Sequence, residues 1–590
     1  MGNFRTLRGY LVQYRWRLLI GLVALLVVDG LQLIIPQVIK GAIDDLTKGG
    51  IVRTDLIRYG LAIAGIALLI GFFRYFWRLL ILGTARRIEE SLRNRLFSHL
   101  QALSLSFFQE TRTGDLMAHA TNDMDAVRMA VGMGLVAVTD TLVLGISSVM
   151  FMLVIDPRLT LFALIPMPFV ALVTTRFSSL VHHRFERVQA AFSTLTEQIR
   201  ESFAGIRVVK AFVQEEHERR KLDHIGEEYV RENLHLIRVW GMFFPLIMFL
   251  ANLGTVIVLW LGGRGTIAGT ITPGGFVAFM TYLGILTWPM MALGWVINLI
   301  QRGSASMGRI NKILDSRPEI ADRPSLRSMT TVEGKIEFRE LVFSYKPELH
   351  PVLRGVTFEV NPGEFVAIVG RTGTGKTTLC TLIPRLFDPP LGHLFIDGRE
   401  IHGVPLKALR GSIGYVPQDT FLFSTSIKEN ITFGFPEAPE DEIDQAVRIA
   451  QIGQEIRAFP MGIETVIGEK GVTLSGGQRQ RIAIARAILL NPRIMILDDA
   501  LSSVDTQTEE RIWQGLGEFL KGRTRIVVSH RLSSIREADN IIVLDEGEIV
   551  EMGDHRSLLS LEGVYAEIYR RQQIEEELNR NQRQVNIHAR

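Results

Sequence analysis

The sequence has almost no cysteine and almost no net charge. Its single cysteine, Cys380, excludes an internal disulfide, and we expect a small buried residue there rather than a redox group. The 65 Lys and Arg nearly balance the 62 Asp and Glu, and a net charge of +3 is too small to indicate a nucleic-acid partner. No short apolar core with a small-residue cleavage site opens the chain, so we expect no cleavable signal peptide.

Length and hydropathy predict two different halves. A chain of 590 residues is too long for one hydrophobic core. The mean hydropathy is +0.20, and 47% of the residues are hydrophobic while 22% are charged. We therefore expect a multidomain protein in which an α-helical transmembrane domain is joined to a soluble domain.

Residues 1–316 are predicted to form the transmembrane domain. They repeatedly provide the roughly 20 mostly apolar residues that one span needs, after an amphipathic stretch that we expect to lie along the membrane interface. Six helices are expected, at 17–46, 56–102, 113–155, 159–207, 217–262 and 274–316.

Several of these helices are longer than a bilayer requires, and the excess is charged. TARRIEESLRNR (84–95) and VHHRFERVQ (181–189) predict extensions into water. Lys and Arg are dense there and sparse in the short connections, which places both termini and the extensions in the cytoplasm, with the helices in the plasma (inner) membrane. The turns 106–115 and 208–216 would then dock a soluble domain.

Four ionisable residues fall inside the predicted spans: Asp29, Arg74, Arg78 and Asp140. Charge at membrane depth is costly and faces a partner or a cavity. An ion pair of Asp29 with Arg74 that fixes helix packing is the favoured interpretation, and contact with a substrate in a cavity is the alternative.

The remaining chain changes character. Residues 317–334 are polar and contain proline, as linkers do. From 335 to 572, short β-rich runs alternate with helical patterns, which predicts an α/β domain. The tail, 573–590, is polar and helical in pattern, and we assign it no role.

The first motif in the predicted α/β domain that indicates a chemical function is a phosphate-binding loop. GRTGTGKTT follows the strand-like run FVAIV and precedes a helical stretch, the context this motif requires. Backbone N–H groups of the glycines would approach phosphate oxygens, the lysine would bridge the β- and γ-phosphates, and the hydroxyl after it would ligate Mg²⁺. The predicted ATP-binding residues are Gly370, Arg371, Thr372, Gly373, Thr374, Gly375, Lys376, Thr377 and Thr378.

Two carboxylates follow a second short apolar run. In RIMILDDALSSVD (493–505), Ile494 to Leu497 read as a buried strand that ends at Asp498 and Asp499. Ligands bind beyond the carboxyl ends of strands in open α/β sheets. Asp498 is therefore predicted to hold the Mg²⁺, usually through water.

LSGGQRQR (474–481), in this order after the phosphate loop and before the Asp pair, resembles the signature of ATP-binding cassette (ABC) proteins. The resemblance implies that Tyr345 stacks on adenine, that Gln418 is the Q-loop glutamine and a Mg²⁺ ligand, that 502–505 is the D-loop, and that His530 is the switch histidine. GEKG (468–471) is similar to an exporter segment that touches the docking turns. Signature residues implied to contact a partner's ATP are Ser475, Gly476, Gly477 and Gln478.

The resemblance extends over essentially the whole chain. With FFQETRTGDL, ATNDMD and TWPMMALGW, the helical half resembles a multidrug-resistance-type ABC exporter half-transporter, in particular the aspartate-bearing half of bacterial heterodimeric exporters. This implies a dimer with two ATP molecules, each bound between one phosphate loop and the other LSGGQ. It also implies membrane lipid around the helices and a small amphipathic substrate moved by alternating access.

Asp499 departs from the family, which normally has Glu there. Because Asp is one methylene shorter, its carboxylate falls short of the attacking water, and a displacement of about 1 Å costs roughly a hundredfold in rate. With Asp499, Gln418 and His530 as the implied catalytic residues, we expect slow hydrolysis at this chain's own site. A second, Glu-bearing subunit is favoured; a homodimer in which water or a small strand shift restores the reach is the alternative.

Other functions remain open at this stage. A homodimeric exporter of lipid or peptide would have the same fold, although no protease-like segment precedes the first span. An ATP-gated channel or a regulatory subunit belongs to a different class. A soluble cassette protein that acts on nucleic acid is contradicted by the six predicted spans.

Overall fold

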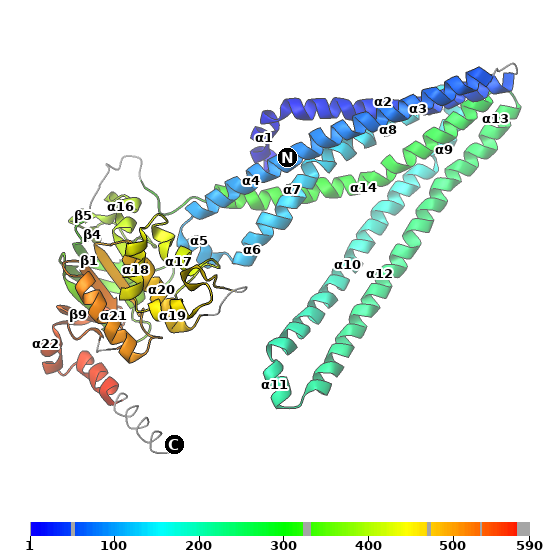
Figure 1. Ribbon diagram of the computed structural model, residues 1–590. Helices are drawn as coiled ribbons and strands as arrows, with labels where there is room; N and C mark the ends of the chain where they lie inside the picture. The colour runs from blue at the N-terminus through cyan, green and yellow to red at the C-terminus, as the bar shows by residue number, and fades with distance from the viewer. Residues whose placement is uncertain (1, 49–52, 323–331, 469–473, 532–533, 575–590) are drawn as a thin grey trace. The chain divides into compact units, whose positions relative to one another are not determined.

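The computed structural model describes residues 2–48, 53–322, 332–468, 474–531 and 534–574. The chain separates into two compact units, the first Met1–Ala102 with Thr111–Ser316, the second Leu103–Glu110 with Arg317–Arg590. In Figure 1 the first unit consists of long helices and the second contains strands and shorter helices.

The first unit has six helical segments that are long and apolar enough to cross a membrane, within the described residues. The six expected spans are thereby confirmed, close to their expected bounds. These segments are Arg15–Lys48, Arg53–Ala102, Thr113–Ile155, Pro157–Ala204, Glu215–Ile267 and Pro273–Asp315.

Short π-helical turns (η2, η3 and η4) interrupt three of these segments, and α10 and α12 run side by side, joined by α11 (Figure 1). The elements of the first unit are η1 Gly2–Thr6, α1 Leu7–Gln13, α2 Arg15–Lys48, α3 Arg53–Trp77, η2 Arg78–Leu82, α4 Gly83–Ala102, α6 Thr113–Ala118, η3 His119–Asp123, α7 Met124–Val131, α8 Met133–Ile155, α9 Pro157–Leu164, α10 Pro166–Ala204, α11 Ile206–Ala211, α12 Glu215–Ile257, η4 Val258–Gly262, α13 Gly263–Ile267 and α14 Pro273–Asp315.

Capping residues fix two helix starts between the spans. Asp156 Oδ1 accepts a hydrogen bond from the Leu159 backbone N–H at 2.8 Å before α9, and Thr272 Oγ1 accepts one from Gly275 at 3.0 Å before α14. Each helix has proline at its first position, where the missing N–H removes no helical hydrogen bond.

The second unit is built on two sheets. The larger has the order β10-β9-β3-β8-β7-β6, in which β10 alone is antiparallel, and the smaller, β2-β1-β4-β5, is antiparallel. The elements of the second unit are α5 Leu105–Glu110, β1 Ile336–Phe343, β2 Leu353–Val360, β3 Phe365–Gly370, α15 Lys376–Leu382, β4 Leu394–Ile396, β5 Arg399–Glu400, η5 Ile401–Gly403, α16 Leu406–Gly411, β6 Ile413–Val416, α17 Ile427–Ile431, η6 Thr432–Gly434, α18 Glu440–Ile449, α19 Gly453–Ala458, η7 Gly462–Glu464, α20 Gly476–Leu489, β7 Ile494–Asp498, α21 Thr506–Phe519, β8 Thr524–Val528, β9 Asn540–Asp545, β10 Glu548–Gly553 and α22 His555–Ser560.

Strand β3 is apolar along its whole length because both of its faces are buried. Ala367 and Val369 pack into the core that α20 and α21 cover, whereas Val366 and Ile368 pack into the core shared with the smaller sheet and α15. Central strands of parallel sheets require this double burial. The predicted α/β domain is confirmed.

Helix α5, from the first predicted docking turn, belongs to the second unit. Ser106 Oγ donates to Glu319 Oε2 at 2.5 Å, and the Ile320 backbone N–H donates to Ser104 Oγ at 3.0 Å. Glu110 forms an ion pair with Lys346 at 2.6 Å. These contacts fix α5 to the chain segment that follows α14.

The charged residues inside the spans do not form the expected ion pair. Asp29 is 1% exposed, and its Oδ2, like Asp140 Oδ1, is buried without a hydrogen-bond partner. Over the described residues, no nitrogen of Arg74 lies within 4.0 Å of the Asp29 carboxylate. Asp29 and Arg74 therefore make no direct salt bridge among the described residues, although the charge of Arg74 acts on the carboxylates of both Asp29 and Asp140.

Gly303 marks the close approach of α14 to α7, and its substitution tests that packing. A Cβ at Gly303 would lie 2.3 Å from Ala130 Cβ, so Gly303→Ala should destabilise the helical unit by about 1–3 kcal/mol. Gly284→Ala, on the same helix with nothing within 4 Å, should be neutral or stabilising by up to ~1 kcal/mol. Thermal unfolding in detergent measures both; equal melting temperatures would contradict the close approach.

Candidate functional site

Glycines give the phosphate loop its shape. Gly370, Gly373 and Gly375 have φ angles of 151°, 87° and 98°, which side chains with a Cβ adopt only under strain. At Gly370 a Cβ would also lie 2.1 Å from Leu544 O. The buried hydroxyl of Thr374 donates to Arg371 O at 3.0 Å and closes the loop.

The loop surrounds the Lys376 ammonium. Lys376 is 7% exposed, and its Nζ donates to Gly370 O at 2.8 Å and to Arg371 O at 2.6 Å. Burial lowers the pKa of Lys376, and the charges of Asp498 and Asp499 oppose that shift. A positive charge held inside a glycine loop is suited to phosphate oxygens.

Asp498 fits the predicted Mg²⁺ site. It is 1% exposed, and its Oδ1 accepts a hydrogen bond from Thr377 Oγ1 at 3.3 Å. Its Oδ2 is buried and has no hydrogen-bond partner among the described residues, which suits an oxygen that coordinates a cation. A carboxylate and a hydroxyl completed by phosphates and water is the ligand set Mg²⁺ prefers.

Asp499 lies at a sharp turn directly after β7. Its φ is 49°, in the left-handed region that Asp enters more readily than most residues. The backbone is fixed from both sides, because Asp499 N–H donates to Val528 O at 2.9 Å and Asp499 O accepts from Ser502 Oγ at 3.0 Å. Burial raises the pKa of the Asp499 carboxyl, and His530 opposes the shift.

The structure brings most of the predicted site residues to one pocket. The phosphate loop, both carboxylates, Gln418 and His530 meet there although they come from four separate parts of the sequence. The residues that line it are Val352, Thr372, Gly373, Gly375, Lys376, Thr377, Thr378, Gln418, Asp498, Asp499, Val528 and His530.

Tyr345 and Arg371 lie beside this pocket rather than in its lining. The Tyr345 hydroxyl shares a hydrogen bond of 2.9 Å with Thr378 Oγ1, and its ring meets the edge of Phe387 with centroids 4.9 Å apart. Arg371 is exposed and forms an ion pair with Glu567 at 3.6 Å. Tyr345 is thereby held next to the start of α15.

The signature residues lie elsewhere. Ser475 Oγ accepts from the Gln478 N–H at 3.2 Å, and Gln478 Oε1 accepts from the Ser475 N–H at 2.9 Å, a reciprocal cap at the start of α20. Neither these residues nor Gly476 and Gly477 line the pocket. The predicted contact of GEKG falls largely on residues 469–471, outside the described residues.

Sequence reasoning missed Arg531 and Glu509. Arg531 follows His530 directly, and its Nη1 forms an ion pair with the carboxylate of Glu509. Two usable signals are present in the sequence, a basic residue next to His530 and an acid shortly after SSVD. Only the fold shows that they meet.

Six membrane-spanning segments and an α/β domain with a phosphate-loop pocket define an ATP-dependent membrane transporter. Residues 18–290 match the family model for the ABC transporter transmembrane region, and residues 353–502 match that for ABC transporters. Together with relatives that align along nearly all of its length, these matches show that the chain belongs to the ABC transporter family.

The relatives include a probable multidrug resistance ABC transporter and a lipid A-core flippase. The chain is 37% identical over 568 residues to the probable multidrug resistance ABC transporter ATP-binding/permease protein YheI of Bacillus subtilis, covering 96% of this chain and 97% of that protein. It is 37% identical to the ATP-dependent lipid A-core flippase of Syntrophus aciditrophicus, covering 96% and 94%. A bacterial Atm1-family ABC exporter with ATP bound superposes with a TM-score of 0.76 at 29% identity, covering 96% and 98%.

The chain is therefore an ATP-hydrolysing ABC exporter, and the predicted fold class is confirmed. Such exporters act as dimers.

Replacing Asp498 separates stability from ligand binding. Burial raises the pKa of Asp498, so the folded domain holds this proton more tightly than the unfolded chain, and ligand-free stability falls as pH rises above the ordinary Asp range. Asp498→Asn should raise the ligand-free melting temperature at pH 7.5 by about 2–4 °C, the shift that ~1 kcal/mol gives in a domain of this size.

At pH 4 that difference should shrink, since wild-type Asp498 is then protonated more often. The variant should also lose the Mg²⁺-dependent part of the thermal shift produced by ATP. Differential scanning calorimetry with and without Mg-ATP checks both; a variant less stable than wild type at pH 7.5 would refute the argument.

Proposed function

We propose that the chain is one half of a heterodimeric exporter of amphipathic compounds, with a slow ATP site of its own. The supporting observation is that Asp499 lies in the phosphate-loop pocket with Gln418 and His530, in the position where the family has Glu. Its carboxylate is one methylene short. The other half would supply Glu and receive this chain's signature.

Each site residue has a proposed role that follows from its placement. Lys376 neutralises the terminal phosphates, and Tyr345, next to α15, offers its ring to adenine. Thr377, Asp498 and Gln418 would hold Mg²⁺, which when bound offsets the phosphate charge. The reciprocal cap at Ser475 and Gln478 holds the signature turn in shape for the partner's ATP.

The length of the side chain at 499 decides the rate in this proposal. Because the backbone of Asp499 is fixed by Val528 O and Ser502 Oγ, it cannot move forward to recover the missing reach. A general base out of reach is ineffective whatever its pKa. ATP at this site is thus held and hydrolysed slowly, while the partner's site turns over.

Transport is proposed to follow alternating access between the two halves in the inner membrane. Lys and Arg are concentrated in the helical extensions and sparse in the short connections, which supports cytoplasmic termini and a cytoplasmic nucleotide-binding domain. The named relatives handle drugs and lipid A-core. We accordingly propose small drug-like or lipid-like amphipathic compounds as the substrate class. We also propose that residues 317–334 are the linker between the transmembrane domain and the nucleotide-binding domain.

Steady-state ATPase activity of the chain alone in lipid nanodiscs tests the proposal. Wild type should not exceed the Lys376→Ala blank, while Asp499→Glu should hydrolyse ATP about a hundredfold faster than that blank, because the longer side chain restores the reach. Asp499→Asn, which has the length of Asp without its charge, should stay at the blank.

Brisk, vanadate-sensitive turnover by the wild-type chain alone would instead establish a competent homodimer. Uphill, ATP-driven uptake of an amphipathic dye into inside-out vesicles separates an exporter from an ATP-gated channel, because a channel only lets substrate run downhill. Dye movement that stops at equal concentrations would contradict export.

A further inference from the structure

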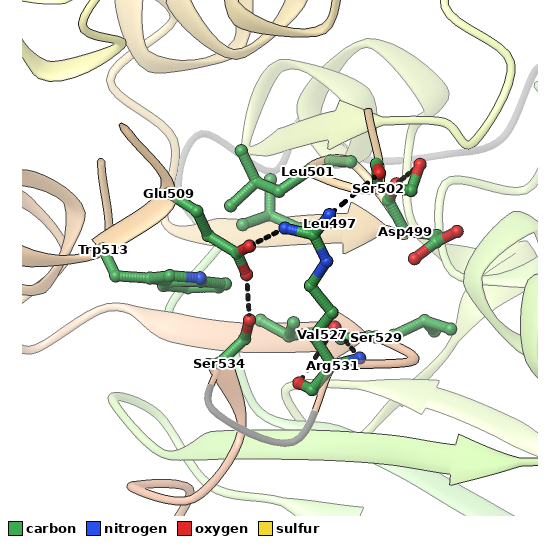
Figure 2. Close-up of a pocket in the computed structure, with 12 residues that line it drawn as sticks. Leu497, Asp499, Leu501, Ser502, Glu509, Trp513, Val527, Ser529, Arg531 and Ser534 are labelled. Atoms are coloured by element: carbon green, nitrogen blue, oxygen red, sulfur yellow. Dashed lines mark hydrogen bonds and ion pairs between the residues drawn. The ribbon is translucent and has the colours of Figure 1, made fainter. Parts of the chain in front are cut away.

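A second pocket adjoins Asp499 and contains a guanidinium in a central position (Figure 2). Arg531 Nη1 donates to Val504 O at 2.9 Å, and its Nη2 donates to Ser502 O at 3.1 Å. Both carbonyls belong to the D-loop, residues 502–505. A single side chain from the segment that carries His530 therefore spans the backbone of the D-loop.

The guanidinium is anchored by a buried acid. Glu509, in the first turn of α21, is 3% exposed. One of its carboxylate oxygens pairs with Arg531, and the other accepts a hydrogen bond from the Ser534 hydroxyl, as Figure 2 shows. Because both oxygens of Glu509 are satisfied, the carboxylate fixes the direction in which Arg531 presents its donors.

The opposite side of the D-loop is held by the signature helix α20. Gln480, 5% exposed, donates from Nε2 to Ser502 Oγ at 3.0 Å and accepts from the Ser503 N–H at 2.9 Å. A Cβ on Gly477 would lie 2.8 Å from Ser503 O, so loop and helix are in direct backbone contact. The D-loop thus lies between Arg531 and the residues that open α20.

These contacts form one continuous path within the nucleotide-binding domain. It begins at His530, passes through Arg531 to the carbonyls of Ser502 and Val504, and continues through Gln480 to the signature turn. Ser502 Oγ also donates to Asp499 O at 3.0 Å. These hydrogen bonds connect the segment that carries His530 with the start of α20.

We propose that Arg531 is a positioning residue, which sets the place of the D-loop and, through Gln480, of the signature turn, with Glu509 as its anchor. Lys cannot replace it, since an ammonium lacks the planar fork that reaches two carbonyls and a carboxylate together. This role of Arg531 does not depend on the residue type at position 499. Its tests compare variants within one preparation, so they can fail or succeed whether or not the ATP site is slow.

The first test is ATPase kinetics of the Arg531→Lys variant. A tagged full-length chain, purified from membranes of its own host with any subunit that accompanies it, is reconstituted in nanodiscs. We expect kcat to fall about tenfold through the misplaced signature turn, with KM for ATP within about twofold of wild type. The thermal shift given by ATP should be retained.

Arg410→Lys is the matched control. Arg410 also donates to two backbone carbonyls, from Nε to Pro384 O at 3.0 Å and from Nη2 to Arg385 O at 2.7 Å, but it does not touch the D-loop. Its kinetics should equal wild type. An equal fall in both variants, or a fall in ATP binding together with kcat, would mean a general structural role and overturn the proposal.

The second test measures hydrogen exchange at the D-loop amides and requires no turnover. In Arg531→Lys the amides of Ser503 and Val504 should exchange at least about tenfold faster, and Glu509→Gln should shift them in the same direction. Arg410→Lys should leave them unchanged. Unchanged exchange in Arg531→Lys would overturn the proposal. This holds even if the preparation hydrolyses ATP no faster than Lys376→Ala, because the exchange measurement requires no turnover.

Discussion

The site depends on the parallel register of β3, β8 and β7. Val528 of β8 pairs with Ile368 of β3 on one side and with Asp498 of β7 on the other. The three strands therefore end at one level, and the phosphate loop, Asp499 and His530 all leave the sheet within two residues of it. Because side chains alternate along a strand, a slip of one residue would turn Asp498 away from Thr377.

That register also places the carboxylates of Asp498 and Asp499 differently relative to the sheet. Leu497 faces the core under α20 and α21, so Asp498 faces the α15 side, where Thr377 Oγ1 meets it. Asp499 does not continue the alternation because its φ of 49° turns the chain. With the backbone of Asp499 held on both sides, the length and the charge of its side chain determine what it can reach in the pocket.

The sequence allowed prediction wherever a local pattern decides structure. The apolar runs of β3 and β7, the glycine loop and the six spans all follow from periodicity and length over adjacent residues. Long-range pairings were out of reach: Arg531 and Glu509 are 22 residues apart, and no pattern says that both are turned toward the D-loop.

The same limit applies to depth in the membrane. The sequence favoured an ion pair of Asp29 with Arg74, but the presence of both residues inside predicted spans does not fix the direction of a side chain around a helix. Likewise, α5 is continuous in sequence with the helical unit yet belongs to the other unit. Neither result is encoded in residues close enough in sequence to form a pattern.

The pocket is electrostatically unfavourable without its ligand, and this contributes to binding. Burial lowers the pKa of Lys376 and raises those of Asp498 and Asp499, so each charge is held with less solvation than it would have in water. Among the described residues, Asp498 Oδ2 has no hydrogen-bond partner. Because the fold and the glycine loop already hold these groups in place, nucleotide phosphates and Mg²⁺ would compensate the charges with little rearrangement of the protein.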